Sequence, residues 1–200
     1  MKWAQALVCC LLAGSEVVGM RICIYPDPIL GEKAQLVTEA SEDIRDILER
    51  MKEVMLKANG IGIAAPQVGI SKRLVVVYNE VIQRVVIGSG DRQGAVDDRP
   101  IEPIFYKMIN PEITGRSSNC ALSTEGCLSL PGVFCEIERA NSVSVEFLDE
   151  QGKKQTVEAT GLLAACFQHE IDHLDGMLFI DRIGDLQKRE QVLIEYYERK

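Results

Sequence analysis

Both histidines of this 200-residue chain lie in one five-residue segment, HEIDH at 169–173. If the segment is helical, His169 and His173 stand four positions apart on one face, so both imidazoles can bind one metal ion. Glu170 then projects beside the ion, where a carboxylate can accept a proton from water. The alternative is a pair of core histidines, which would need other polar partners. The pattern therefore favours a metal centre with a neighbouring base.

A third metal ligand has to come from elsewhere in the chain. A thiolate is a better candidate than Glu190, Glu195 or Glu198, because it binds such metals strongly and these glutamates are expected on an amphipathic surface helix. Cys166 lies one turn before His169 on the same predicted helix face. Spacing alone does not choose between it and three upstream cysteines, Cys120, Cys127 and Cys135.

Helices are predicted where apolar residues repeat every three or four positions, over about 41–59, 161–175 and 185–199. Ser41 has the position of an N-cap for the first of them. The helix at 161–175 carries HEIDH and is apolar on most sides, which is typical of a core helix. The histidines are therefore expected in a largely buried place.

Strands are predicted at short apolar or alternating runs, which are 21–25, 74–78, 104–109, 127–131, 142–147 and 155–159. The glycine-rich stretch 60–70 is expected to form a loop. The polar stretch 79–103 is expected to be a surface loop or insertion whose role the sequence leaves open.

The composition is that of an ordinary globular chain, with 46% hydrophobic and 26% charged residues. Its length suits one domain with one sizeable core. The net charge of −8 argues against a generally basic nucleic-acid-binding surface, although a local contact with ribosomal RNA is compatible with it. Seven cysteines, without the spacing of a disulfide framework, indicate a reducing, cytosolic compartment.

Residues 1–19 have two interpretations. Lys2 followed by the apolar run ALVCCLLAG resembles the start of a secretory signal, but the run is too short to span a bilayer as a helix. Alternatively, Met20 is the functional start, which we favour because the thiol-rich remainder is typical of a cytosolic protein. We treat 1–19 as an N-terminal extension whose status the sequence leaves open.

Three segments of the chain resemble, in order, the signature motifs of the peptide deformylases. They are GIGIAAPQ (60–67), EGCLS (125–129) and QHEIDH (168–173). YPDPIL (25–30) and INPEI (109–113) are similar to that family as well, and the likeness covers residues 20 to about 183. Three motifs in the family's order make a chance match very improbable.

The resemblance implies an α+β fold, with mixed or antiparallel sheets packed around a central metal-binding helix and a further helix at the C-terminus. We therefore expect one catalytic domain over 20–200. The implied activity is hydrolysis of the N-formyl group from the N-terminal formylmethionine of newly synthesised peptides, which releases formate. A cytoplasmic monomer that makes no membrane contact and touches the ribosome only transiently fits this activity.

The resemblance also assigns the metal ligands and the reacting groups. Cys127 becomes the third ligand beside His169 and His173, and the ion is expected to be Fe(II) in vivo, with Zn, Ni or Co as substitutes. Glu170 is expected to move the proton from water to the leaving amine. The donors that stabilise the oxyanion are implied to be the amide of Gln67 and the backbone N–H of Leu128.

Further residues are implied to bind substrate or support the site. Glu125 is implied to pair with Arg139 and so to support the strand that carries Cys127. Phe134 stands where some relatives have an arginine near the substrate backbone, so the resemblance does not imply that arginine contact in this chain. The residues implied to line the substrate site, including the pocket for the methionine side chain, are Ile61, Gly62, Gly126, Leu162 and Cys166.

Two other functions are also compatible with the H-E-x-x-H pattern. An H-E-x-x-H peptidase that cleaves internal amides would need a third ligand other than Cys127, so Cys127→Ser would keep metal and proteolysis. A non-catalytic, metal-stabilised binding module would not need Glu170, so Glu170→Gln would leave its function intact. In a deformylase, by contrast, Glu170→Gln would nearly abolish turnover while the metal stays bound.

Overall fold

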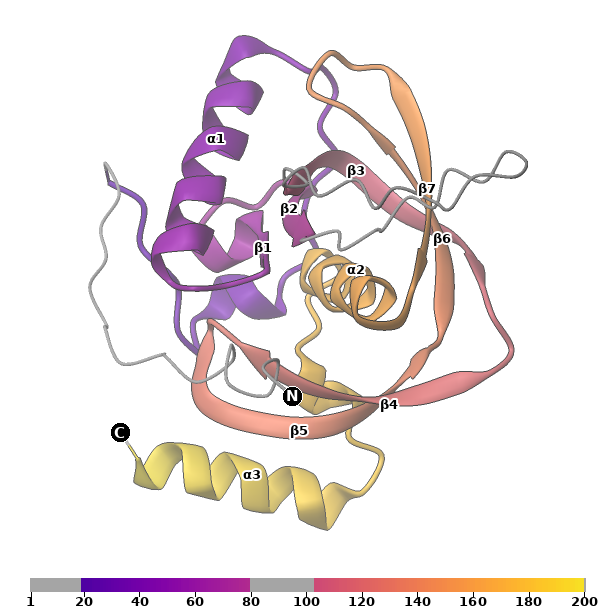
Figure 1. The fold of residues 1–200 in the computed structure, drawn as a ribbon. Helices are drawn as coiled ribbons and strands as arrows, with labels where there is room; N and C mark the ends of the chain where they lie inside the picture. Colours follow the sequence, from indigo (N-terminus) through magenta and orange to yellow (C-terminus); the bar gives the residue numbers. More distant parts are fainter. Residues whose placement is uncertain (1–18, 80–102, 200) are drawn as a thin grey trace, which may run out of the picture.

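The structure, a computed structural model, describes residues 19–79 and 103–199. Two antiparallel sheets surround a buried helix, and two further helices cover them from outside (Figure 1). This confirms the predicted α+β class with a C-terminal helix, and both sheets are antiparallel throughout. The expected extension at 1–19 and the connection at 79–103 lie, except for their edge residues, outside the described ranges.

The larger sheet has five strands in the order β1-β2-β3-β6-β7. Hydrophobic side chains alternate between its two faces: Val75 and Val77 of β2 pack toward the buried helix, and Leu74 and Val76 pack toward the first helix. The strand is therefore covered on both sides. The strand bounds are β1 Gly62–Ala64, β2 Leu74–Asn79, β3 Ile104–Arg116, β6 Ser142–Leu148 and β7 Lys154–Thr160.

The smaller sheet consists of β4 (Cys120–Cys127) and β5 (Leu130–Ala140), which pair antiparallel. The prediction of one strand over 127–131 was wrong, because the chain turns back at 128–129 between these two strands. The prediction of a strand at 21–25 was also wrong. There Cys23 and Tyr25 donate single backbone hydrogen bonds to Gln67 and Ser129 instead of joining a ladder.

The three helices lie where helical spacing predicted them. They are α1 (Glu42–Lys57), α2 (Gly161–Leu174) and α3 (Leu186–Glu198). The N-cap of α1 is Ser41, whose hydroxyl accepts a hydrogen bond from Ile44 N, and Asp185 caps α3 in the same way. No helix in 19–79 or 103–199 is long and apolar enough to cross a membrane.

Helix α2 lies in the centre of the fold, between the two sheets (Figure 1). From Ala164 to Leu174 every residue of it is buried. Apolar residues such as Phe167 and Ile171 contribute to the cluster beneath the five-stranded sheet. A separate cluster joins β5 to α3 and to the short helix η4 (Phe179–Arg182) through Ile137, Phe179 and Tyr196. The polar residues of α2 are thereby held at fixed positions in a packed interior.

Candidate metal centre

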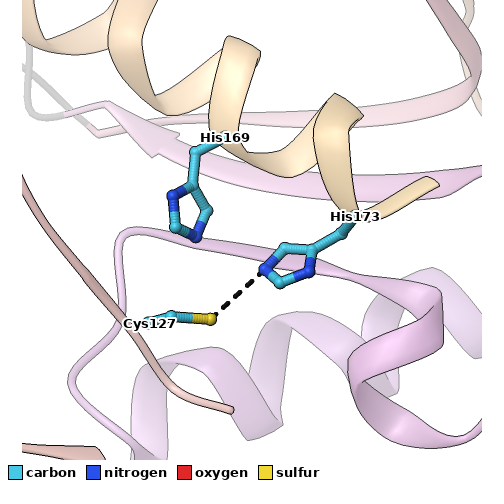
Figure 2. Close-up of side chains that lie close together, drawn as sticks. All are labelled: Cys127, His169 and His173. Atoms are coloured by element: carbon cyan, nitrogen blue, oxygen red, sulfur yellow. Dashed lines mark hydrogen bonds between the residues drawn. The ribbon is translucent and has the colours of Figure 1, made fainter. Parts of the chain in front are cut away.

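Three side chains from two elements converge beside α2 (Figure 2). The ligand atoms of Cys127, His169 and His173 all lie within 4.8 Å of one another, and Cys127 Sγ is 3.2 Å from His173 Nε2. Within the described residues, this is the one such group of histidine, cysteine or acidic side chains. Cys166, the alternative thiol, is not part of it.

Local backbone geometry explains how these residues meet. His169 and His173 are four positions apart on α2, and therefore share a face. Cys127 is the last residue of β4, where the register with β5 shifts between Gly126 and Cys127. Such an irregularity changes the direction of a strand at its end and can re-aim a side chain. The sulfur can therefore meet two imidazoles on an element that follows more than thirty residues later.

The orientation of His169 is set by a buried ion pair. His169 Nδ1 lies 2.8 Å from Glu125 Oε2, and Arg139 donates to both carboxylate oxygens of Glu125, over 2.6 and 2.9 Å. All three side chains are nearly fully buried. An Nδ1–H donated to a carboxylate leaves Nε2 as the free nitrogen, the tautomer that a metal ligand needs. This contact joins the predicted Glu125–Arg139 pair directly to the histidine.

The electrostatics of this cluster follow from burial and pairing. Burial raises the pKa of Glu125, but hydrogen bonds from Arg139 and His169 outweigh it, so the net pKa is lowered. Burial, the neighbouring His169 and Arg139 hold the pKa of His173 well below its usual range. The Glu125 carboxylate is therefore ionised and the His173 imidazole neutral at pH 7, and a neutral imidazole is the form that binds metals.

Glu170 lies in the same buried region, facing the glycine-rich segment. Burial raises its pKa to about 7. Its Oε2 atom is buried without a hydrogen-bond partner among the described residues. A Cβ atom added to Gly62 of β1 would lie 2.8 Å from Glu170 Cδ and 2.9 Å from Cys166 Sγ. Only glycine therefore lets the backbone pass this close to the carboxylate.

Gln67 contacts Cys127 from the short helix η3 (Ala65–Val68). Its Oε1 accepts a hydrogen bond from Ala64 N over 2.8 Å, which identifies Nε2 as the end that faces the cluster. Nε2 donates to Cys127 Sγ and to Ser129 Oγ, both over 3.3 Å. Leu128 lies in the turn after β4, so its backbone N–H is outside the β4–β5 ladder.

Four of the five residues expected to line the substrate site lie close to the cluster or to Glu170, and the fifth does not. Gly62 and Cys166 face each other across β1 and α2, and Cys166 Sγ lies 3.9 Å from the carbonyl oxygen of Ile61. Gly126 is next to Cys127 and pairs with Phe134. Leu162 stands apart: it lies in the first turn of α2 and is 55% exposed.

The donor set and its surroundings fit a metal ion. One thiol and two imidazoles suit Fe, Zn, Ni or Co, and three protein ligands leave a coordination position open. The unpartnered oxygen of buried Glu170 points to a donor such as water beside these ligands, because a buried carboxylate oxygen is costly without a hydrogen bond. The arrangement can thus activate water next to a base.

Three residues that contact the cluster or the groups around it had no role predicted from the sequence. Ser129 and Gln168 belong to quoted motifs but received no role; the Gln168 amide bonds both the N–H and the carbonyl of Ala140 and so fastens α2 to the end of β5. Arg182 contacts both carboxylate oxygens of Asp172. Ser129 and Gln168 could have been singled out by their positions in the EGCLS and QHEIDH motifs. No sequence signal pointed to Arg182.

Known proteins that are similar to this chain in sequence and in structure belong to one family. A model of the polypeptide deformylase family matches residues 20–189. A peptide deformylase of Thermodesulfovibrio yellowstonii is 45% identical over 166 residues, covering 82% of this chain and 88% of that protein. One from Rhizobium meliloti is 41% identical over 172 residues, covering 86% and 88%. The crystal structure of peptide deformylase from Ehrlichia chaffeensis matches with a TM-score of 0.74 at 33% identity, covering 92% of this chain and 97% of that one.

Proposed function

Since the chain belongs to the polypeptide deformylase family, whose members hydrolyse the N-formyl group of newly made peptides with a metal ion, we propose that Cys127, His169 and His173 hold that ion. The observation that carries the proposal is the convergence of these three ligand atoms beside the unpartnered carboxylate oxygen of Glu170. When bound, a divalent ion supplies Lewis acidity, which polarises a carbonyl oxygen and lowers the pKa of water.

Glu170 is the residue that moves the proton. Its carboxylate takes a proton from the attacking water, whose oxygen bonds to the formyl carbon. It then gives that proton to the leaving nitrogen as the C–N bond breaks, so the products are formate and a peptide with a free amino terminus. Burial raises the pKa of Glu170 to about 7 in the metal-free protein, and a neighbouring cation favours its ionised form, the form that acts as base.

Gln67 and Leu128 stabilise the charge that develops on the formyl oxygen. The Gln67 amide is held by Ala64 N and Ser129, so its N–H groups are oriented before substrate binds. The backbone N–H of Leu128 lies in the turn directly after Cys127. Donors fixed in advance stabilise a transition state because they need no reorganisation during the reaction.

Substrate binding is assigned to backbone near the cluster. Gly62 is the first residue of β1 and follows Ile61, and Gly126 directly precedes Cys127 in β4. Cys166 lies beside Gly62 and Ile61, and with Leu162 one turn earlier it would form the wall of a pocket for the methionine side chain. The apolar lining suits a thioether side chain.

The finer properties of the enzyme are proposed from the same chemistry. Fe(II) is the expected ion in vivo, with Zn, Ni or Co able to replace it, since the ligand set accepts all of them. A ferrous thiolate centre needs a reducing compartment, and the described cysteines are all free, which supports a cytoplasmic location. We propose a monomeric catalytic domain over 20–200 whose contact with the ribosome is transient.

Neither alternative function is favoured by a specific observation. A peptidase of the H-E-x-x-H type would need a different third ligand, yet within 19–79 and 103–199 the cluster contains no other histidine or acidic side chain. A binding module would give no reason for Glu170 to be buried beside these residues with its Oε2 atom unpartnered within 19–79 and 103–199.

Formate release from formyl-methionyl peptides by anaerobically purified, metal-loaded protein tests the proposal. Acetyl-methionyl peptides serve as the control, because they present the same side chain with a different acyl group. We expect formate from the first and no turnover of the second. A fully metal-loaded protein that releases no formate would refute the proposed function.

A further inference from the structure

A continuous row of charged side chains leads from His169 to the protein surface. His169 Nδ1 contacts Glu125 Oε2 over 2.8 Å, and Glu125 accepts two hydrogen bonds from Arg139. Arg139 Nη1 then donates to Asp172 Oδ2 over 2.6 Å. The row ends at Arg182, which binds both oxygens of Asp172 from outside.

Arg182 makes a bidentate contact with Asp172. Its Nε donates to Asp172 Oδ2 over 3.0 Å, and its Nη2 donates to Oδ1 over 2.5 Å. Asp172 Oδ2 is therefore shared between Arg139 and Arg182, while Oδ1 is bound by Arg182. Planar fork geometry of this kind is specific to arginine, because lysine offers a single point charge.

The charges of the row balance only when Arg182 is included. Glu125 and Asp172 are two buried carboxylates, with side chains 6% and 8% exposed, and the guanidinium of Arg139, 5% exposed, binds both of them. Without Arg182, this single cation would have to satisfy both carboxylates, since Oδ1 of Asp172 would lose its donor. A buried carboxylate that lacks a partner is strongly unfavourable, so Arg139 would be drawn toward Asp172 and away from Glu125.

We propose that Arg182 is a positioning residue for the metal ligand His169. By holding Asp172, it lets Arg139 keep both hydrogen bonds to Glu125, and Glu125 in turn fixes the tautomer and ring orientation of His169. The inference rests on the proposed metal ligation by His169. It adds a role for a residue on η4, outside the three sequence motifs and touching none of the reacting groups.

Metal affinity of the Arg182→Met protein tests the proposal, with Arg189→Met as the matched control. Arg189 is paired with Asp181, and its side chain is 37% exposed, compared with 39% for Arg182, but this pair does not contact Asp172. The probe is Co(II), whose dissociation constant is measured by competition with a chromophoric chelator and whose visible absorption reports the ligand geometry. Thermal melting of metal-free and Co(II)-loaded forms separates metal binding from folding.

Loss of a group that directly orients a metal ligand costs about 10–100-fold in affinity. Arg182 acts on such a group, Glu125, through two intervening residues, so its loss is expected to weaken Co(II) binding by about 3–10-fold. Arg182→Met should also change the visible spectrum, and Arg182→Lys should restore about half of the loss on a logarithmic scale, because it returns the charge without the fork. Arg189→Met should leave affinity and spectrum unchanged. Asp172→Asn combined with Arg182→Met should weaken binding no further than Asp172→Asn alone.

Three results would overturn the inference, and they are distinguishable. If the parent binds Co(II) at the proposed ligands but Arg182→Met matches Arg189→Met in affinity and spectrum, the positioning role is wrong while the proposed function stands. A lower melting temperature in the metal-free form, with an unchanged Co(II) dissociation constant, would likewise assign Arg182 a purely structural role. If the parent itself binds no Co(II), the proposed metal centre fails and this inference fails with it.

Discussion

The side-chain amide of Gln67 donates to Cys127 Sγ over 3.3 Å, although the two residues are 60 positions apart in the sequence. The Gln67 carboxamide is held on its other side by Ala64 N, so its orientation does not depend on Cys127 alone. The group proposed to stabilise the oxyanion is therefore anchored to the proposed metal ligand before any substrate arrives. Two motifs distant in the sequence thus form a single rigid site.

Replacing Gln67 by alanine should lower kcat about 10²–10³-fold, because one preorganised oxyanion donor is lost. Metal content should change little, since none of the proposed ligand atoms belongs to Gln67. Steady-state kinetics of formate release measure the effect, together with metal analysis of the same preparation. An increase in KM at unchanged kcat would instead mean that Gln67 only binds the ground state.

Gly62→Ala should displace the Glu170 side chain. The new Cβ would lie 2.8 Å from Glu170 Cδ and 2.9 Å from Cys166 Sγ, closer than real Cβ contacts allow. We expect kcat to fall at least about tenfold, since a misplaced base loses much of the 10²–10⁴-fold contribution of proton transfer. Gly31→Ala, whose Cβ would meet no atom within 4 Å, is the control. Equal kcat values for Gly62→Ala and Gly31→Ala would contradict the close contact between the Gly62 backbone and the Glu170 side chain.

Arg139→Met should reduce the free energy of unfolding by about 3–5 kcal/mol, because it leaves Glu125 and Asp172 buried without their shared cation. Urea denaturation of the metal-free protein at pH 7 measures the change. Arg189→Met, which breaks a partly exposed pair, should cost no more than about 1 kcal/mol. A similar decrease in the free energy of unfolding in both variants would show that burial does not increase the contribution of the Arg139 contacts to stability.

The raised pKa of Glu170 predicts a pH effect on folding in the metal-free protein. Burial favours the protonated carboxyl in the folded state, with a pKa of about 7 against an ordinary value of 4.5. Between these values the folded state binds more protons, so this group's contribution to stability is lost as pH rises through the window. Glu170→Gln should therefore stabilise the metal-free protein at pH 8, by up to about 3 kcal/mol, and have little effect at pH 4. A stability difference between parent and variant that is constant from pH 4 to pH 8 would contradict this.

The sequence predicted those parts of the fold that are set by local periodicity. Helix α2 and the shared face of His169 and His173 follow from spacing alone, and α1 follows from Ser41 and the apolar repeat after it. The strand prediction at 127–131 failed because period-two alternation does not reveal a turn at 128–129. The prediction at 21–25 failed because a strand needs a paired neighbour, which depends on tertiary structure.

Prediction of the site was limited by contacts between distant segments. Helical spacing could not choose between Cys127 and Cys166; the EGCLS resemblance made that choice, and in the structure it is Cys127 that lies next to the two histidines. Glu125 and Arg139 were paired by resemblance as well, whereas the extension of their pair through Asp172 to Arg182 had no sequence signal. Such a row depends on how η4 packs against α2, which no local pattern encodes.

The most direct test of the central claim compares metal content in two cysteine variants, Cys127→Ala and Cys166→Ala. Both thiols lie near the cluster, but only Cys127 contributes a ligand atom to it. Metal analysis after anaerobic purification should give about one ion per chain for Cys166→Ala and almost none for Cys127→Ala, since a thiolate is one of three protein ligands. Full metal content in Cys127→Ala, together with loss of metal from Cys166→Ala, would contradict the proposed centre.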